Sequence, residues 1–444
     1  MTDHLELTIE RPVAGGRMIA RHDGRIVFVA GGIPGERVRV RVDKTSRQAW
    51  WATVVDVLEA SPDRREPLCD PACGGSTFAY IAYDRQRELK QQILMDAFRR
   101  LGRITIDEPP AVMASPERGY RLRARLHAAE SRLGFFLEGT HTVCDAALTA
   151  QLRPDATAAA TALLAALGPR AADCEAIVIS ENVAATDRVL HLEARSGTRW
   201  DPATAGLAGG FAETLSAVTG VTTLVGGQIR TLSGRDAVTD TADALFGGAS
   251  PFSQAATWTR RAPAFFQGNR FLVGDLVRCV LDHADNDRVV DLYAGVGLFS
   301  VALAARGATV TAVESEPFAA EDLFANARPW GGRLQVLQAT VEDAMRHPAG
   351  DRPGVVVLDP PRTGVSPDAM RGITAWRMPR IVYVSCDPPT LARDAAKFAE
   401  SGYRLSSLTA FDMFPNTPHV EAVATFTFTG ETPSPAPDRS HRRP

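Results

Sequence analysis

The stretch RVVDLYAGVGLFSVALAARG, residues 288–307, decides the fold class of this chain. A short apolar run reaches Asp291, a turn with Gly295 and Gly297 follows, and the remaining residues favour a helix. A strand, a tight glycine turn and a helix in this order open a parallel, doubly wound α/β sheet. Four further buried strands are predicted after this unit: ATVTAVE (308–314), RLQVLQA (333–339), GVVVLD (354–359) and RIVYVSC (380–386).

The composition is typical of a globular protein. Hydrophobic residues make up 45% of the 444 residues, charged residues 23%, and the formal net charge is -3. No apolar run reaches the ~18–20 residues that a membrane span requires, and the N-terminus lacks the basic-then-apolar order of a secretory signal. Six cysteines do not make a disulfide scaffold. We therefore expect a reducing, cytoplasmic setting, without membrane contact and without an obligate protein partner.

The chain is predicted to be a multidomain α/β protein. Residues 1–60 contain short alternating runs separated by glycine turns, which favours a small β-barrel of the oligonucleotide-binding kind. Residues 61–250 mix short strands with alanine-rich helices, so we expect a middle α+β domain. Residues 251–430 form the doubly wound domain, and the proline-rich residues 431–444 are expected to be a disordered tail.

Two local patterns lie in the first 110 residues. Arg37, Arg39 and Arg41 alternate with valines, which places three guanidiniums on one face of a strand. A solvated face and an RNA-binding face explain this stripe equally well. Apolar residues at helical spacing predict a helix over residues 84–101 that stops at Gly102.

Polar residues stand at the ends of the predicted strands of residues 251–430, where a doubly wound sheet binds its ligands. Glu314 ends the second strand, and an acid at this place accepts hydrogen bonds from ribose hydroxyls. Ser300 stands where the dinucleotide fingerprint has its third glycine, so S-adenosylmethionine fits better than NAD. A plain strand–turn–helix connection without a ligand is the alternative interpretation.

The tripeptide Asp-Pro-Pro occurs twice, starting at Asp359 and at Asp387. The first copy ends a strand, and its prolines hold the Asp359 carboxylate beside the cleft. The second copy directly follows Cys386, and a helix that begins there favours a thiolate. A thiolate is the natural nucleophile for conjugate addition to a ring carbon. Cys279, in an apolar helical run, is expected to be only a buried hydrophobe.

Five segments together resemble the RNA uracil-5 methyltransferases, which make 5-methyluridine in tRNA or rRNA. The resemblance covers the C-terminal third in order, and residues 1–60 resemble the TRAM domain that many of these enzymes carry. Residues 61–250 occupy the place of their RNA-binding central domain. The segments are FFQGN (265–269), DLYAGVGLFS (291–300), VVLDPPRTG (356–364), VYVSCDPPTLARD (382–394) and PHVEAVA (418–424).

This resemblance implies a reaction, a cofactor and an RNA partner. Cys386 would add to carbon 6 of uracil, which makes carbon 5 nucleophilic toward the methyl group of S-adenosylmethionine. Glu421, in the segment matching PHVE, would then remove the proton from carbon 5. The target base would have to be flipped out of folded RNA. The chain has Leu298 where the family often has asparagine. The family's cofactor pocket corresponds to Gln267, Tyr293, Gly295, Gly297, Glu314 and Asp359.

Many relatives hold a [4Fe–4S] cluster on four cysteines, three of them in a C-x5-C-G-G-C pattern. This chain offers Cys69 and Cys73, but Ser76 stands in the place of the third cysteine. Cys144 lies five residues before the place of the fourth ligand, where Thr149 stands. Since a stable cluster normally needs four thiolates, we expect no cluster and no other metal site.

Three rival functions remain open. The first is a methyltransferase that acts on an exocyclic amine through Asp359, with Cys386 merely structural. The second is an RNA-binding protein with a degenerate methyltransferase fold, which predicts erosion of the cofactor loop or the nucleophile. The third is a cytosine-5 RNA methyltransferase, although those enzymes generally have a Pro-Cys nucleophile that this chain lacks.

Overall fold

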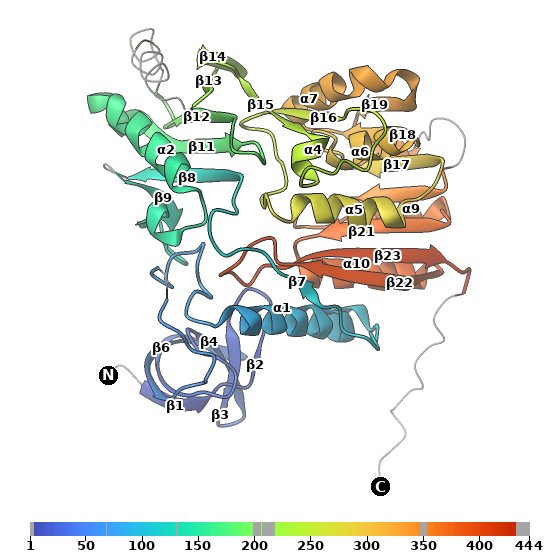
Figure 1. Cartoon of the computed structure of the whole chain (residues 1–444). Coiled ribbons are helices and arrows are strands. Elements are labelled where there is room, and N and C mark those ends of the chain that lie inside the picture. Colours follow the sequence, from blue (N-terminus) through green and yellow to red (C-terminus); the bar gives the residue numbers. More distant parts are fainter. Residues whose placement is uncertain are drawn as a thin grey trace.

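Three large β-sheets organise the computed structural model of this chain: the N-terminal sheet lies at the lower left of Figure 1, the central sheet above it and the C-terminal sheet at the right. The structure describes residues 4–67, 69–129, 132–198, 206, 218–346 and 353–431. The predicted tail therefore lies outside the described residues, except for residue 431. Among the described helices, none has the length and apolar character needed to cross a bilayer.

The N-terminal sheet has six strands in the order β1-β5-β6-β4-β3-β2. Its core contains Leu7, Val27 and Val38, which alternate with solvent-facing residues along their strands. The Arg37, Arg39 and Arg41 stripe lies on β5, and each of its guanidiniums pairs with a carboxylate: Arg37 with Glu6 and Glu59, Arg39 with Glu6 and Asp56, and Arg41 with Asp43. The strands are β1 (His4–Thr8), β2 (Arg11–Pro12), β3 (Met18–His22), β4 (Arg25–Ala30), β5 (Arg37–Thr45) and β6 (Ala49–Glu59).

The central sheet has seven strands in the order β10-β9-β8-β11-β12-β13-β14. One face packs on helix α2 through buried residues such as Leu126, Ile177 and Leu163. The elements are β8 (Arg123–Ala129), β9 (Arg132–Phe136), β10 (Val143–Asp145), α2 (Pro154–Ala166), β11 (Cys174–Glu181), β12 (Arg188–Ala194), β13 (Gly220–Val225) and β14 (Gln228–Gly234), with short 3₁₀ helices at Ala146–Thr149 and Gly168–Asp173.

The C-terminal sheet has eight strands in the order β19-β18-β17-β20-β21-β23-β22-β7. Strands β17 to β21 run parallel, and β23 is inserted antiparallel between β21 and β22. This order confirms the predicted doubly wound fold. The strands are β17 (Arg288–Leu292), β18 (Thr309–Glu314), β19 (Leu334–Gln338), β20 (Val355–Leu358), β21 (Arg380–Ser385), β22 (Tyr403–Phe411) and β23 (Glu421–Phe428).

Helices cover both faces of the C-terminal sheet. One layer buries residues such as Leu276, Leu303 and Leu323 of α5, α6 and α7, and the other buries Ile373 and Leu391 of α9 and α10. The helices are α5 (Val273–His283), α6 (Leu298–Arg306), α7 (Pro317–Ala327), α8 (Val341–Arg346), α9 (Pro367–Ala375) and α10 (Pro388–Glu400), with a 3₁₀ helix at Arg328–Arg333.

Residues between the first two sheets also reach the C-terminal domain. Helix α1 (Tyr83–Ala97) continues into a π-helix at Phe98–Gly102, as predicted for residues 84–101 with a stop at Gly102. Leu94 and Phe98 pack in the same core as Leu391 of α10, and strand β7 (Val112–Met113) pairs with β22. The strands β15 (Ala237–Thr241) and β16 (Thr257–Arg261) form a separate hairpin with α4 (Ala242–Leu245) after β15.

Candidate active site

Strand register brings Cys386 and Glu421 together. Strand β21 ends at Ser385, and Ser385 pairs with Ala422 of the antiparallel neighbour β23. The residues just beyond this pair, Cys386 and Glu421, therefore face each other at the carboxyl end of β21. Parallel strand β20 ends beside them at Leu358, so that Asp359 reaches the same edge. Three side chains separated by up to 62 positions in the sequence thus meet through strand pairing alone.

The Cys386 thiol is held mostly in its protonated form. Burial and, to a smaller extent, the neighbouring Glu421 and Asp359 carboxyls raise its pKa to about 11, although Arg362 opposes this rise by its charge and by hydrogen bonding. Helix α10 begins just after the cysteine, where the Asp387 side chain caps it by accepting a hydrogen bond from the Thr390 backbone N–H at 2.9 Å. The Arg362 guanidinium is therefore the nearby cation that favours the thiolate.

Glu421 lies almost fully buried at the start of β23, with 2% of its surface exposed. Burial raises the pKa of its carboxyl to about 8, Asp359 adds to the rise, and Arg362 opposes it. A carboxyl that titrates near pH 8 is suited to exchange a proton at physiological pH.

Asp359 joins Cys386 and Glu421 to the loop that carries FFQGN. Gln267 donates a hydrogen bond from Nε2 to the Asp359 carboxyl at 3.2 Å. Burial and the neighbouring Asp291 raise the pKa of Asp359 to about 7, and the Gln267 hydrogen bond opposes the rise. An amide and a carboxyl side by side offer donors and acceptors to the edge of a planar heterocycle.

The glycine turn lies beside the end of β18. The Glu314 carboxylate accepts hydrogen bonds from the backbone N–H of Gly295 at 2.8 Å and of Ser315 at 2.8 Å. Gly295 and Gly297 both adopt positive φ, and the space where a Cβ of Gly295 would stand is open. Tyr293 also has positive φ and is only partly buried. These residues fit S-adenosylmethionine, since Glu314 offers a ribose acceptor above an open glycine turn.

The structure adds Arg362 and His419, which the sequence did not single out. Arg362 lies in the DPPR segment, and its positive charge lowers the pKa of Cys386, Glu421 and His419. Burial and the cations Arg362, Lys90 and Arg121 lower the pKa of His419 to about 4, so that it is neutral at pH 7. The sequence shows the DPPR motif, but the pairing of β21 with β23 decides which side chains lie near its arginine.

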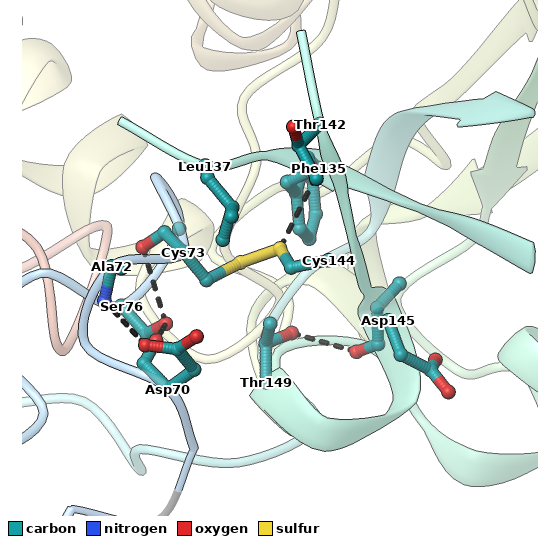
Figure 2. Close-up of a disulfide and its surroundings, with 12 residues drawn as sticks. Asp70, Ala72, Cys73, Ser76, Phe135, Leu137, Thr142, Cys144, Asp145 and Thr149 are labelled. Carbon is teal, nitrogen blue, oxygen red and sulfur yellow. Dashed lines mark hydrogen bonds between the residues drawn. A yellow bond between two sulfur atoms is a disulfide. The ribbon is translucent and has the colours of Figure 1, made fainter. Parts of the chain in front are cut away.

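Two of the three cysteines considered above as cluster ligands form a disulfide with each other (Figure 2). Cys73 and Cys144 are bonded, with a Cα–Cα distance of 5.9 Å, and Cys69 remains a free thiol. Ser76 and Thr149 lie nearby, and both hydroxyls hydrogen-bond to backbone carbonyls. This donor set does not fit a [4Fe–4S] cluster, and no group of metal ligands occurs among the described residues.

The disulfide differs from the expectation of reduced cysteines. Cys73 forms an isolated β-bridge with Leu137, just beyond β9, and Cys144 lies on the adjacent strand β10. The disulfide therefore joins two cysteines that are 71 positions apart. Cys279 packs against the main hydrophobic core, as a small hydrophobe would, but it is only partly buried, whereas the sequence predicted a buried side chain.

The fold and the polar strand ends define a class I methyltransferase preceded by a TRAM domain. Family models match three segments of the chain. They are the TRAM domain over residues 3–55, the TRM5/TYW2 methyltransferase domain over residues 269–357 and the tRNA (Uracil-5-)-methyltransferase family over residues 352–427.

Relatives of similar length extend this match to nearly the whole chain. The 23S rRNA (uracil(1939)-C(5))-methyltransferase RlmD of Pseudomonas aeruginosa is 32% identical over 95% of this chain and 93% of its own. The enzyme of the same name from Methylococcus capsulatus is 33% identical over 94% of this chain and 96% of its own. The chain therefore belongs to the RNA uracil-5 methyltransferase family.

A solved structure shares the fold. The Pyrococcus abyssi tRNA (uracil-54, C5)-methyltransferase, crystallised with S-adenosyl-L-homocysteine, superposes with a TM-score of 0.73 at 23% identity. The similarity covers 95% of this chain and 99% of the archaeal one. The similarity in fold therefore extends over the N-terminal and central sheets as well as the C-terminal domain.

Proposed function

We propose that this protein methylates carbon 5 of a uridine in RNA through a covalent adduct of Cys386, with Glu421 as the base that removes the carbon-5 proton. The opposition of Cys386 and Glu421 across β21 and β23 is the observation that carries this proposal. Relatives that resemble the chain over nearly its full length are named for 23S rRNA, which favours a 23S rRNA uridine as the target.

The first step needs the sulfur as a thiolate. Arg362, which hydrogen-bonds to Cys386, stabilises this form. The thiolate adds to ring carbon 6, a carbon–sulfur bond forms, and the electron pair of the 5,6 double bond moves into the ring carbonyl as an enolate. Arg362 also stabilises the developing negative charge, because its guanidinium carries a fixed positive charge beside Cys386.

Glu314, Tyr293 and the turn at Gly295 and Gly297 would hold S-adenosylmethionine, whose sulfonium methyl group would pass to carbon 5 and leave S-adenosylhomocysteine. Gln267 and Asp359 line the space between this turn and Cys386 and orient the base there. Carbon 5 then carries both the new methyl group and its original proton.

Glu421 completes the reaction. Its carboxylate takes the proton from carbon 5, the double bond re-forms, and the carbon–sulfur bond breaks to return the Cys386 thiolate. The proton passes from Glu421 to water, so that the enzyme is restored. A carboxyl with a pKa of about 8 accepts and releases this proton near neutral pH.

The test measures 5-methyluridine in RNA by mass spectrometry after reaction with the purified protein. Cys386→Ala should abolish methylation, whereas Glu421→Gln should accumulate a protein–RNA adduct that resists denaturation. Cys279→Ser is the matched control and should react like the wild type. Methylation that survives in Cys386→Ala would favour the exocyclic-amine alternative, and RNA binding without any methylation would favour the degenerate-fold alternative.

A further inference from the structure

A row of basic residues leads from the central sheet to the candidate active site. Arg121, Arg123, Arg125 and His127 alternate along β8 and the residues just before it, and all four are partly exposed. The intervening residues Leu122, Ala124, Leu126 and Ala128 are buried, most of them in the core beneath α2. The basic side chains therefore occupy the face of the central sheet opposite α2.

Most buried arginines around this face have a carboxylate partner. Arg188 and Arg270 pair with Glu181, and Arg260 pairs with Asp240. At the outer end of the row, Arg125 pairs with both Glu175 and Glu193 at 2.7 Å. This pairing is the usual way in which a protein compensates a guanidinium that has lost water.

Arg121 and Arg123, the inner arginines of the row, are different. Arg121 donates to the Gln151 side chain at 2.7 Å and to the Arg123 carbonyl at 3.0 Å, and it stacks on Phe135 and Phe414. Arg123 donates to the carbonyls of Ala262 and Pro263 at 3.3 and 2.9 Å. Within the described part of the chain, no carboxylate lies within salt-bridge distance of either guanidinium.

The two inner arginines also lie close to other cations. Arg362 lowers the pKa of Arg121. Burial and the charges of Arg121 and Arg260 lower the pKa of Arg123 to about 10, against the opposing effect of the Glu193 carboxylate. Arg362 in turn contacts Cys386. A partly exposed run of positive charge thus extends from the central sheet toward Cys386. Since Arg121 and Arg123 have no carboxylate within salt-bridge distance among the described residues, this run favours a bound anion.

The loop that Arg123 contacts continues into the active site. Pro263 accepts its hydrogen bond, and Gln267 of the same loop contacts Asp359. Between them, the Phe265 side chain is 61% exposed, so the loop that leads to Gln267 carries an exposed aromatic ring. Cations that follow a strand and an exposed ring beside them form the usual surface for single-stranded nucleic acid.

We propose that Arg121 and Arg123 bind the phosphate backbone of a single-stranded RNA segment next to the target uridine, and that this segment lies along β8. The inference rests on the proposed function, since it places the RNA relative to Cys386. It excludes the Arg37, Arg39 and Arg41 stripe as the main phosphate contact, because carboxylates already compensate those guanidiniums.

The experiment measures binding without chemistry. In a Cys386→Ala background, fluorescence anisotropy of a labelled oligouridylate gives the Kd at several KCl concentrations. Arg123→Gln should weaken binding about tenfold and reduce the slope of log Kd against log salt by about one. Arg123→Lys, which keeps the charge, should restore most of the binding. Arg125→Gln, whose guanidinium is already paired, is the matched control and should leave the Kd and the slope unchanged.

Three results would overturn the inference. Equal effects of Arg123→Gln and Arg125→Gln would show that only total charge matters. A loss of S-adenosylmethionine binding in Arg123→Gln, measured by calorimetry with the RNA affinity intact, would assign the missing anion to the cofactor carboxylate. An unchanged Kd in both Arg123→Gln and Arg121→Gln, with unchanged melting temperatures, would remove the arginines from the interface. None of these results would affect 5-methyluridine formation by the wild type, which tests the proposed function separately.

Discussion

Arg362 and Asp359 each act on both Cys386 and Glu421, with opposite effects on their pKa values. Arg362 lowers the pKa of both Cys386 and Glu421, while burial and the Asp359 carboxyl raise both. Burial therefore disfavours the charged forms of Cys386 and Glu421, the proposed nucleophile and base, whereas the Arg362 guanidinium favours both charged forms. Removing the Arg362 charge should therefore raise the pKa of both Cys386 and Glu421.

Replacing Arg362 by glutamine should slow alkylation of Cys386. A neighbouring charge commonly shifts a pKa by about one unit or more, so the thiolate fraction at pH 8 should fall about tenfold. The measurement is the rate of iodoacetamide labelling at Cys386, followed by peptide mass spectrometry across pH. Arg371→Gln, on the exposed side of α9, serves as the control. An unchanged labelling profile in Arg362→Gln would show that the guanidinium does not control the thiol.

The pH dependence of the reaction should report Glu421. A base works only when it is deprotonated, and the Glu421 carboxyl is mostly protonated below its pKa of about 8. Because Glu421 acts after methyl transfer, kcat at saturating substrate should therefore rise about tenfold per pH unit below pH 8 and level off above it. Initial rates of 5-methyluridine formation between pH 6 and pH 10 would test this. A rise that continues toward pH 11 would instead assign the limiting step to ionisation of Cys386.

The second Asp-Pro-Pro copy belongs to a helix. Asp387 caps α10, and its two prolines occupy the first turn, where a missing N–H costs nothing. The first copy instead exposes Asp359 to the site. The same three letters thus start a helix in one place and line a pocket in the other, depending on which side chain partners are within reach.

Asp387→Ala should destabilise the protein without changing the chemistry. Loss of an N-cap aspartate costs about 1 kcal/mol, whereas Asp387→Asn retains an acceptor and should cost much less. Urea unfolding followed by circular dichroism measures the difference, and Asp387→Asn should methylate RNA like the wild type. If Asp387→Asn were as inactive as Cys386→Ala, Asp387 would have a chemical role that its cap geometry does not suggest.

The Cys73–Cys144 disulfide ties the loop after the TRAM domain to the central sheet. Its neighbour Gly75 accepts a hydrogen bond from Gln151, which also holds Tyr120 and Arg121. The bridge thus supports the position of the basic row as well as the packing of two sheets.

Reducing this disulfide should lower the thermal stability of the whole chain. Closing a segment with a separation of 71 residues stabilises the folded state by about 4 kcal/mol in the chain-entropy description. The melting temperature of the wild type should therefore fall with a phosphine reductant, and Cys73→Ser should melt low with or without it. Cys279→Ser is the control and should respond like the wild type. A wild-type melting curve that ignores the reductant would contradict a stabilising bridge.

The strand and helix content of the C-terminal domain could be predicted from the sequence, because buried strands, glycine turns and helical spacing are local patterns. The predicted strands at 308–314, 354–359 and 380–386 correspond to β18, β20 and β21. The candidate residues Cys386 and Glu421 came from a resemblance carried by contiguous segments. Neither their opposition nor the pairing of β7 with β22 is local, since both depend on the register of strands far apart in the chain.

Charge compensation was decided only by the tertiary structure. The sequence displays Arg37, Arg39 and Arg41 as a basic stripe, yet all three guanidiniums have carboxylate partners, those of Arg37 and Arg39 on the neighbouring strands β1 and β6 and that of Arg41 on β5 itself. Arg121 and Arg123 alternate in the same way and have none among the described residues. Cys73 likewise reaches Cys144 of β10 only because it forms an isolated β-bridge with Leu137, just after β9. Periodicity along one strand says which face a side chain occupies, but the partner across from it is supplied by a segment that only folding brings near.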